Sequence, residues 1–134
     1  SLDHFTSEVA EEAPILEGQF IDEEWGGVNE PHLLANGLVG VLGHIACFDE
    51  KQNRYYYPMV FALNPDTGEF SDIELIATRS VFLEGSFKRP DLINVVFAGG
   101  LIRKADGTAD LYAGISDAEA QKISMIDPFL KYER

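Results

Sequence analysis

The fold of this chain is decided by residues 32–79, HLLANGLVGVLGHIACFDEKQNRYYYPMVFALNPDTGEFSDIELIATR. Three polar turns divide this stretch into four apolar or alternating runs. Asn36-Gly37 tolerates positive φ at both positions, and the Asn-Pro-Asp-Thr-Gly run at 64–68 combines a preset φ with a closing glycine. Both patterns predict tight turns between strands, so we expect a four-stranded antiparallel meander. The expected strands are 32–35, 38–48, 55–63 and 70–79.

The same pattern restarts after a loop at 80–90. Gly99-Gly100 predicts a bulge or a close backbone approach inside the first strand of this second unit. Ala105-Asp106-Gly107 predicts a turn. The second unit therefore shows three strands, with its outer strand absent or borrowed. Its expected strands lie within 92–104, 110–116 and 121–126.

Helical periodicity is weak throughout the chain. Residues 7–12 and 117–122 are long enough for only one turn of helix. The predicted fold class is therefore all-β, with antiparallel four-stranded meanders of the β-propeller-blade type. The first blade is expected over about 25–79, and the incomplete second blade over about 91–127.

Composition narrows the classes of partner. The 134 residues fit one domain, and 46% of them are hydrophobic, which is enough for a core. The formal charge is −13, from 23 acidic and 10 basic residues. This charge disfavours nucleic acid and anionic membranes, whose phosphates attract Lys and Arg. A neutral partner such as a carbohydrate stays compatible, as does a role of the charge in solubility alone.

The acidic N-terminus bears on domain organisation, and the cysteine content bears on cellular location. Residues 1–24 hold eight acidic side chains and no Lys or Arg, so we expect an acidic leader or linker over 1–13 and a β module over 14–134. Cys47 is the single cysteine, which favours a reducing cytoplasm and an inert thiol. The spacing of the three histidines matches no metal-binding motif, and no nucleotide-binding glycine motif occurs, so neither a metal nor a cofactor is predicted.

Six runs of the sequence stand out as motifs. They are Trp25-Gly26-Gly27-Val28-Asn29-Glu30-Pro31-His32, Gly40-Val41-Leu42-Gly43-His44-Ile45, Ala77-Thr78-Arg79-Ser80, Lys88-Arg89-Pro90-Asp91, Val95-Val96-Phe97-Ala98-Gly99-Gly100 and Leu111-Tyr112-Ala113-Gly114-Ile115-Ser116-Asp117. Together they resemble the C-terminal part of the bacterial DUF1861 family. The likeness covers roughly residues 14–130, and the runs around Trp25–His32 and Asp117 are the most specific.

The resemblance implies a fold and a function. That family is similar to five-bladed β-propeller glycosidases and mannoside phosphorylases, so this chain is expected to supply nearly two blades and the outer strand of a third. It implies part of a carbohydrate-active protein, inactive as this chain alone, because the catalytic acid of such enzymes lies in an earlier blade. The alternative is a non-catalytic sugar- or protein-binding β module. Open strand edges predict self-association or pairing with missing blades.

Candidate substrate-binding residues begin at the first strand. Glu30 and His32 alternate with Pro31, so both side chains are expected on one face, where they could line a pocket. The alternatives are a loop carboxylate bonding backbone amides for Glu30 and a packed strand histidine for His32. Asn29 suits a sugar hydroxyl, but a turn asparagine in the left-handed region explains it equally well.

Basic residues in this acidic chain form a second set of candidates. Lys88 and Arg89 are suited to an anion such as phosphate. Asp91 beside them is expected to stay ionised, which favours a ligand-orienting carboxylate, with a surface ion pair as the alternative. Arg79 is a similar anion-binding candidate.

Asp117 is the strongest candidate for contact with a sugar. In the phosphorylases that this chain resembles, an Asp follows a Tyr–x–Gly-type strand, and residues 111–117 match that spacing. The match departs at Ile115-Ser116, where small residues are common in those enzymes. The alternative for Asp117 is the N-cap of a short helix over 118–122.

Overall fold

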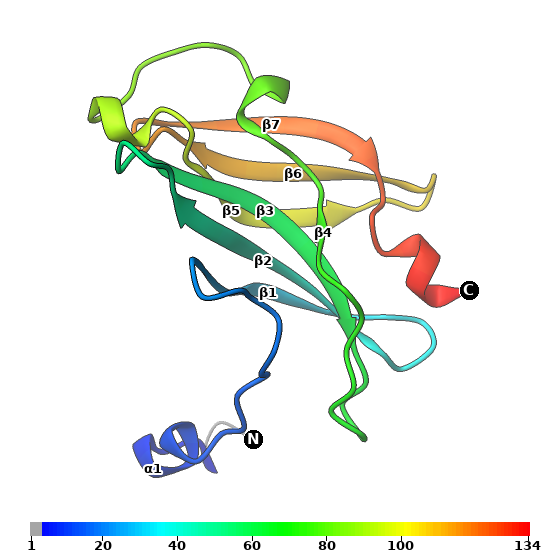
Figure 1. Ribbon diagram of the computed structural model, residues 1–134. Coiled ribbons are helices and arrows are strands. Elements are labelled where there is room, and N and C mark those ends of the chain that lie inside the picture. Colours follow the sequence, from blue (N-terminus) through cyan, green and yellow to red (C-terminus); the bar gives the residue numbers. More distant parts are fainter. Residues whose placement is uncertain (1–3) are drawn as a thin grey trace.

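The computed structural model describes residues 4–134, and Figure 1 shows them as two antiparallel sheets that lie one against the other. The first sheet has the order β1-β2-β3-β4 and the second the order β5-β6-β7. The strands are β1 (Glu24–Leu33), β2 (Val39–Phe48), β3 (Arg54–Leu63), β4 (Glu74–Leu75), β5 (Val96–Arg103), β6 (Thr108–Ile115) and β7 (Glu119–Ile126). The short helices are α1 (Ser7–Glu11), η2 (Arg79–Val81), η3 (Pro90–Leu92) and η4 (Leu130–Glu133).

The predicted all-β fold class is confirmed, with four strands in the first unit and three in the second. The turn chemistry explains the connections. Gly37, Gly68 and Gly107 all have positive φ, at +87°, +78° and +86°, which glycine adopts without a steric cost. The predicted bulge is also present, between Ala98 and Gly100 in β5.

Two strand predictions were wrong in extent. The first strand begins at Glu24, eight residues before the predicted start, because Gly26 permits an approach that a side chain would block. A Cβ at Gly26 would lie 2.2 Å from the backbone oxygen of His44. The strand expected over 70–79 shrinks to the two residues of β4, apart from a bridge at Phe70. Pro58 on β3 accepts a hydrogen bond from the amide of Ile76 but has no N–H to return, so the ladder stops there.

The main core lies between the two sheets. Val60 of the first sheet and Val96, Leu111 and Ile115 of the second are fully buried in it, and Phe129 closes it from the C-terminal side. A smaller cluster on the opposite face of the first sheet is built on Val41, Met59 and Phe61. Leu16 and Phe20 from the N-terminal segment pack against this cluster.

The C-terminal segment joins both sheets. Arg103, at the end of β5, donates from Nε to Asp127 and from both terminal nitrogens to Glu133. Glu133 also accepts from the backbone amide of Ala35, and the Asn36 side chain donates to the Tyr132 carbonyl. These contacts tie the β1–β2 turn of the first sheet to β5 and β7 of the second.

A buried carboxylate on β6 predicts how acid affects stability. Asp110 is 6% exposed and accepts from Lys104 Nζ at 2.8 Å and from Ser124 Oγ at 2.6 Å. The Lys104 hydrogen bond, followed by that of Ser124, lowers the pKa of Asp110 to about 2. A pKa below the unfolded value of about 4 gives stability that is present above pH 4 and is lost as the pH falls toward 2.

We therefore expect Asp110→Asn to make the free energy of unfolding less dependent on pH between about 4 and 2. Urea unfolding measured across this range for both proteins checks the prediction. Asp66→Asn, at an exposed turn position, is the matched control and should keep the wild-type slope. Parallel pH profiles for wild type and Asp110→Asn would contradict the assignment.

Candidate functional site

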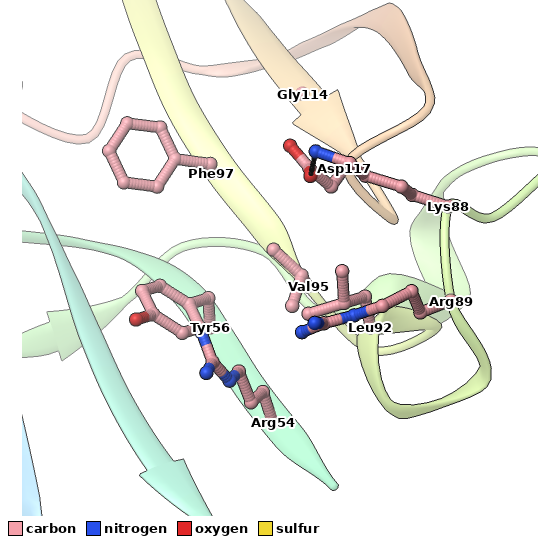
Figure 2. A pocket seen from close by; sticks show the side chains of 9 residues that line it. All are labelled: Arg54, Tyr56, Lys88, Arg89, Leu92, Val95, Phe97, Gly114 and Asp117. Atoms are coloured by element: carbon pink, nitrogen blue, oxygen red, sulfur yellow. Dashed lines mark hydrogen bonds and ion pairs between the residues drawn. The ribbon is translucent and has the colours of Figure 1, made fainter.

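One cleft of about 480 Å³ opens where the two sheets meet, at the end that carries the β2–β3 and β6–β7 turns. Three of the predicted site residues, Lys88, Arg89 and Asp117, line it together. Figure 2 shows side chains entering it from β3, from the segment before β5 and from the turn after β6. The lining residues are Arg54, Tyr56, Lys88, Arg89, Leu92, Val95, Phe97, Gly114 and Asp117.

Ion pairs organise the charged side of the cleft. Lys88 Nζ lies 2.8 Å from Asp117 Oδ2, and Arg89 lies 3.1 Å from Asp91 Oδ2. The Lys88 hydrogen bond and charge lower the pKa of Asp117, with a smaller contribution from Arg89. Asp117 is therefore ionised at neutral pH, which suits acceptance of hydrogen bonds from hydroxyl groups and does not suit proton donation.

The position of Asp117 follows from a strained turn. Ser116 and Asp117 have φ of +54° and +52°, and the Ala118 amide bonds back to the Ile115 carbonyl. Positive φ at both central residues is typical of a type I′ hairpin turn, and β7 begins at Glu119. The alternative of a helix N-cap at Asp117 was therefore wrong.

Ser116 holds this turn against the segment that carries the cations. Its side chain is 1% exposed, and its Oγ donates to the Ile93 carbonyl at 2.8 Å. Its backbone amide donates to the Val95 carbonyl, and its own carbonyl accepts from the Lys88 amide. One residue thus fixes Asp117 and Lys88 relative to each other.

Aromatic rings form the other wall. Tyr56 and Phe97 line the cleft, and the His44 ring lies beside both, at centroid distances of 5.8 and 5.0 Å. Trp25 donates from its indole nitrogen to the Tyr56 hydroxyl at 3.3 Å. Burial lowers the pKa of His44, so the ring is neutral at pH 7. Its Nδ1 lies 2.9 Å from Asn29 Oδ1, so Asn29 contacts the aromatic wall through His44.

The remaining candidates lie outside this cleft. His32 Nε2 is 2.6 Å from Glu30 Oε1, so both side chains do share a face of β1, and Glu30 lies over Gly100 of β5. The His32 ring packs against Phe129 at 5.1 Å. Arg79 lies in a separate cavity of about 420 Å³ and donates to the Phe82 carbonyl.

The predicted site residues do not include three polar or aromatic side chains of the cleft, Arg54, Tyr56 and Phe97. All three lie in strands whose local sequence does not single them out. The alternation of faces along β3 and β5 was the one sequence signal that could have selected them.

The described part of the chain, residues 4–134, holds no group of three His, Cys, Asp or Glu side chains placed to bind a metal ion. In that same range, no helix is long and apolar enough to cross a bilayer.

The described chain is an all-β protein of two stacked antiparallel sheets, with a polar and aromatic cleft where they meet. The chain belongs to the DUF1861 family, described as proteins of unknown function, whose pattern it matches over residues 1–131. No curated protein matches the chain.

Solved structures from Leishmania share the fold. A mannose phosphorylase from Leishmania mexicana, MPT-4, solved with a phosphate ion, is 36% identical with a TM-score of 0.90 over 99% of this chain. A GDP-Man-dependent mannosyltransferase from the same organism, MPT-1, is 30% identical with a TM-score of 0.89 over 100% of this chain. A hypothetical protein from Leishmania major is 33% identical with a TM-score of 0.88, again over 100%. The chain spans less than half of these proteins: 42% of the first and 44% of the other two.

Proposed function

We propose that this chain forms part of a glycosidase- or glycoside-phosphorylase-like protein and that its cleft contacts the carbohydrate. The observation that carries the proposal is the meeting of Asp117, Lys88 and Arg89 with Tyr56 and Phe97 in one cleft. Aromatic faces pack against the apolar faces of sugar rings, while charged groups bind hydroxyls or an anion. The mannose phosphorylase and mannosyltransferase among the similar structures support a sugar substrate.

Cleavage of a glycosidic bond needs a second acidic group besides Asp117. Glycoside cleavage in most such enzymes uses two carboxyl groups about 5 to 9.5 Å apart, one of them a proton donor. Among the nine lining residues, Asp117 is the single carboxyl group, and it is ionised. Asp117 therefore orients substrate in this proposal, and the proton donor comes from another part of the full-length protein. Further contacts with the substrate or an anion stay proposed for Glu30, His32, Asn29, Asp91 and Arg79.

The test is turnover of β-mannosides by the natural full-length protein, with and without phosphate. We expect Asp117→Asn to lower kcat/KM by about 10- to 100-fold, because a lost charge-assisted hydrogen bond costs about 1.5–3 kcal/mol. Asp66→Asn, outside the cleft, is the control and should leave turnover unchanged. Wild-type turnover in Asp117→Asn would remove Asp117 from the site.

A second candidate is a non-catalytic module that binds a sugar or a protein through the same cleft. The lone cleft carboxylate favours it, and mannoside binding without any turnover by the full-length protein would establish it. The outer edges of β1 and β7 have no neighbouring strand within residues 4–134, which supports pairing with another copy or with further blades. Size-exclusion chromatography tests the pairing, and cell fractionation tests the proposed cytoplasmic location.

A further inference from the structure

The charges around the cleft are unequally compensated. Lys88 is matched by Asp117 and Arg89 by Asp91, each within ion-pair distance. Arg54 also lines the cleft, and no carboxylate within residues 4–134 lies in ion-pair contact with it. Arg54 thus supplies the net positive charge of the cleft, in a chain whose formal charge is −13.

Packing against an aromatic ring restricts the movement of the Arg54 side chain. It is the first residue of β3, paired in register with Phe48 on β2, and its guanidinium carbon lies 5.5 Å from the centre of the Phe48 ring. That ring in turn packs against Trp25 at 5.0 Å. Stacking on an aromatic face limits the movement of a guanidinium and leaves its in-plane N–H groups free to donate.

We propose that Arg54 is the principal group with which the cleft binds a phosphate-type oxyanion. A guanidinium fork can donate two parallel hydrogen bonds to two oxygens of such an anion. Lys88 and Arg89, which extend into the cleft from the segment before β5 (Figure 2), add donors but must share them with Asp117 and Asp91. The inference rests on the proposed function, since it names the chemistry that the same cleft binds.

Calorimetric titration of the full-length protein with inorganic phosphate tests the proposal. We expect Arg54→Gln to raise the Kd by about 10-fold or more, the loss typical of one charge-assisted pair. Arg54→Lys keeps the charge without the fork and should recover part of the affinity. Lys51→Gln removes a cation from the β2–β3 turn, outside the cleft, and should change Kd by less than about twofold. Lys88→Gln should weaken binding less than Arg54→Gln does.

Three results would overturn the proposal: wild-type affinity in Arg54→Gln, equal losses in Lys51→Gln and Arg54→Gln, or no saturable phosphate binding by the wild-type protein. A parallel titration with mannose 1-phosphate distinguishes free phosphate from a phosphoryl group carried by a sugar. Phosphate binding without mannoside turnover would reject the proposed function and keep the role of Arg54. Mannoside turnover without phosphate binding would keep the proposed function and reject the role of Arg54.

Discussion

Replacing Arg103 with alanine is expected to lower the free energy of unfolding by about 2–3 kcal/mol. The Arg103 Nε donates to Asp127 at 2.7 Å, and its two terminal nitrogens donate to Glu133 at 2.9 Å each. Asp127 is 3% exposed, so the substitution leaves a buried carboxylate without its cation. Such a loss costs about 3–5 kcal/mol for fully buried pairs, and the partial exposure of Arg103 and Glu133 reduces it here.

Urea unfolding measures this effect through the transition midpoint. Arg89→Ala is the matched control, because Arg89 also pairs with an aspartate but is 56% exposed at its side chain. We expect the control to cost less than about 1 kcal/mol. Equal destabilisation by the two substitutions would show that the C-terminal segment contributes no more than a surface ion pair.

Phe129→Ala is expected to cost about 3–5 kcal/mol, the usual range for removing a buried phenyl ring. Phe129 is fully buried and belongs to the core between the sheets. Gly40 shows how tightly the ring is packed, since a Cβ there would lie 2.7 Å from the Phe129 ring. The cavity left by alanine would therefore lie beside Gly40 of β2.

The control is Phe70→Ala, at a phenylalanine that is 36% exposed and for which we expect a loss of about 1 kcal/mol. Arg103 lies over the Phe129 ring at 5.8 Å, so the double variant Arg103→Ala/Phe129→Ala should lose less than the two single losses added together. Strict additivity, or a Phe129→Ala loss no larger than that of Phe70→Ala, would contradict the packing described.

Local turn chemistry accounts for most of what the sequence predicts about the fold. Asn36-Gly37 and Ala105-Asp106-Gly107 encode their turns in two or three residues, and the structure confirms both. The strand expected over 70–79 ends after Leu75 for a non-local reason, because Pro58 in the neighbouring strand has no N–H to continue the ladder. Alternation within 70–79 contains no information about that partner.

The site was predictable where charge stood out against its surroundings. Lys88, Arg89 and Asp117 were selected from local composition and spacing, and they line one cleft. Arg54 reaches the same cleft only because the β2–β3 register and the stacking of the second sheet place it there. The contact between Asn29 and His44 depends on a bulge in β1, which no local pattern in the sequence indicates.

The placement of three cations in one cleft of a strongly acidic chain has a kinetic consequence. A phosphate dianion far from the surface meets the repulsive field of the 23 acidic residues, and attraction prevails only inside the cleft. Salt screens fields beyond about 8 Å at physiological ionic strength, and it acts less on charges in close contact. Moderate salt should therefore speed the capture of an anion by this protein, the reverse of the usual slowing of electrostatically steered association.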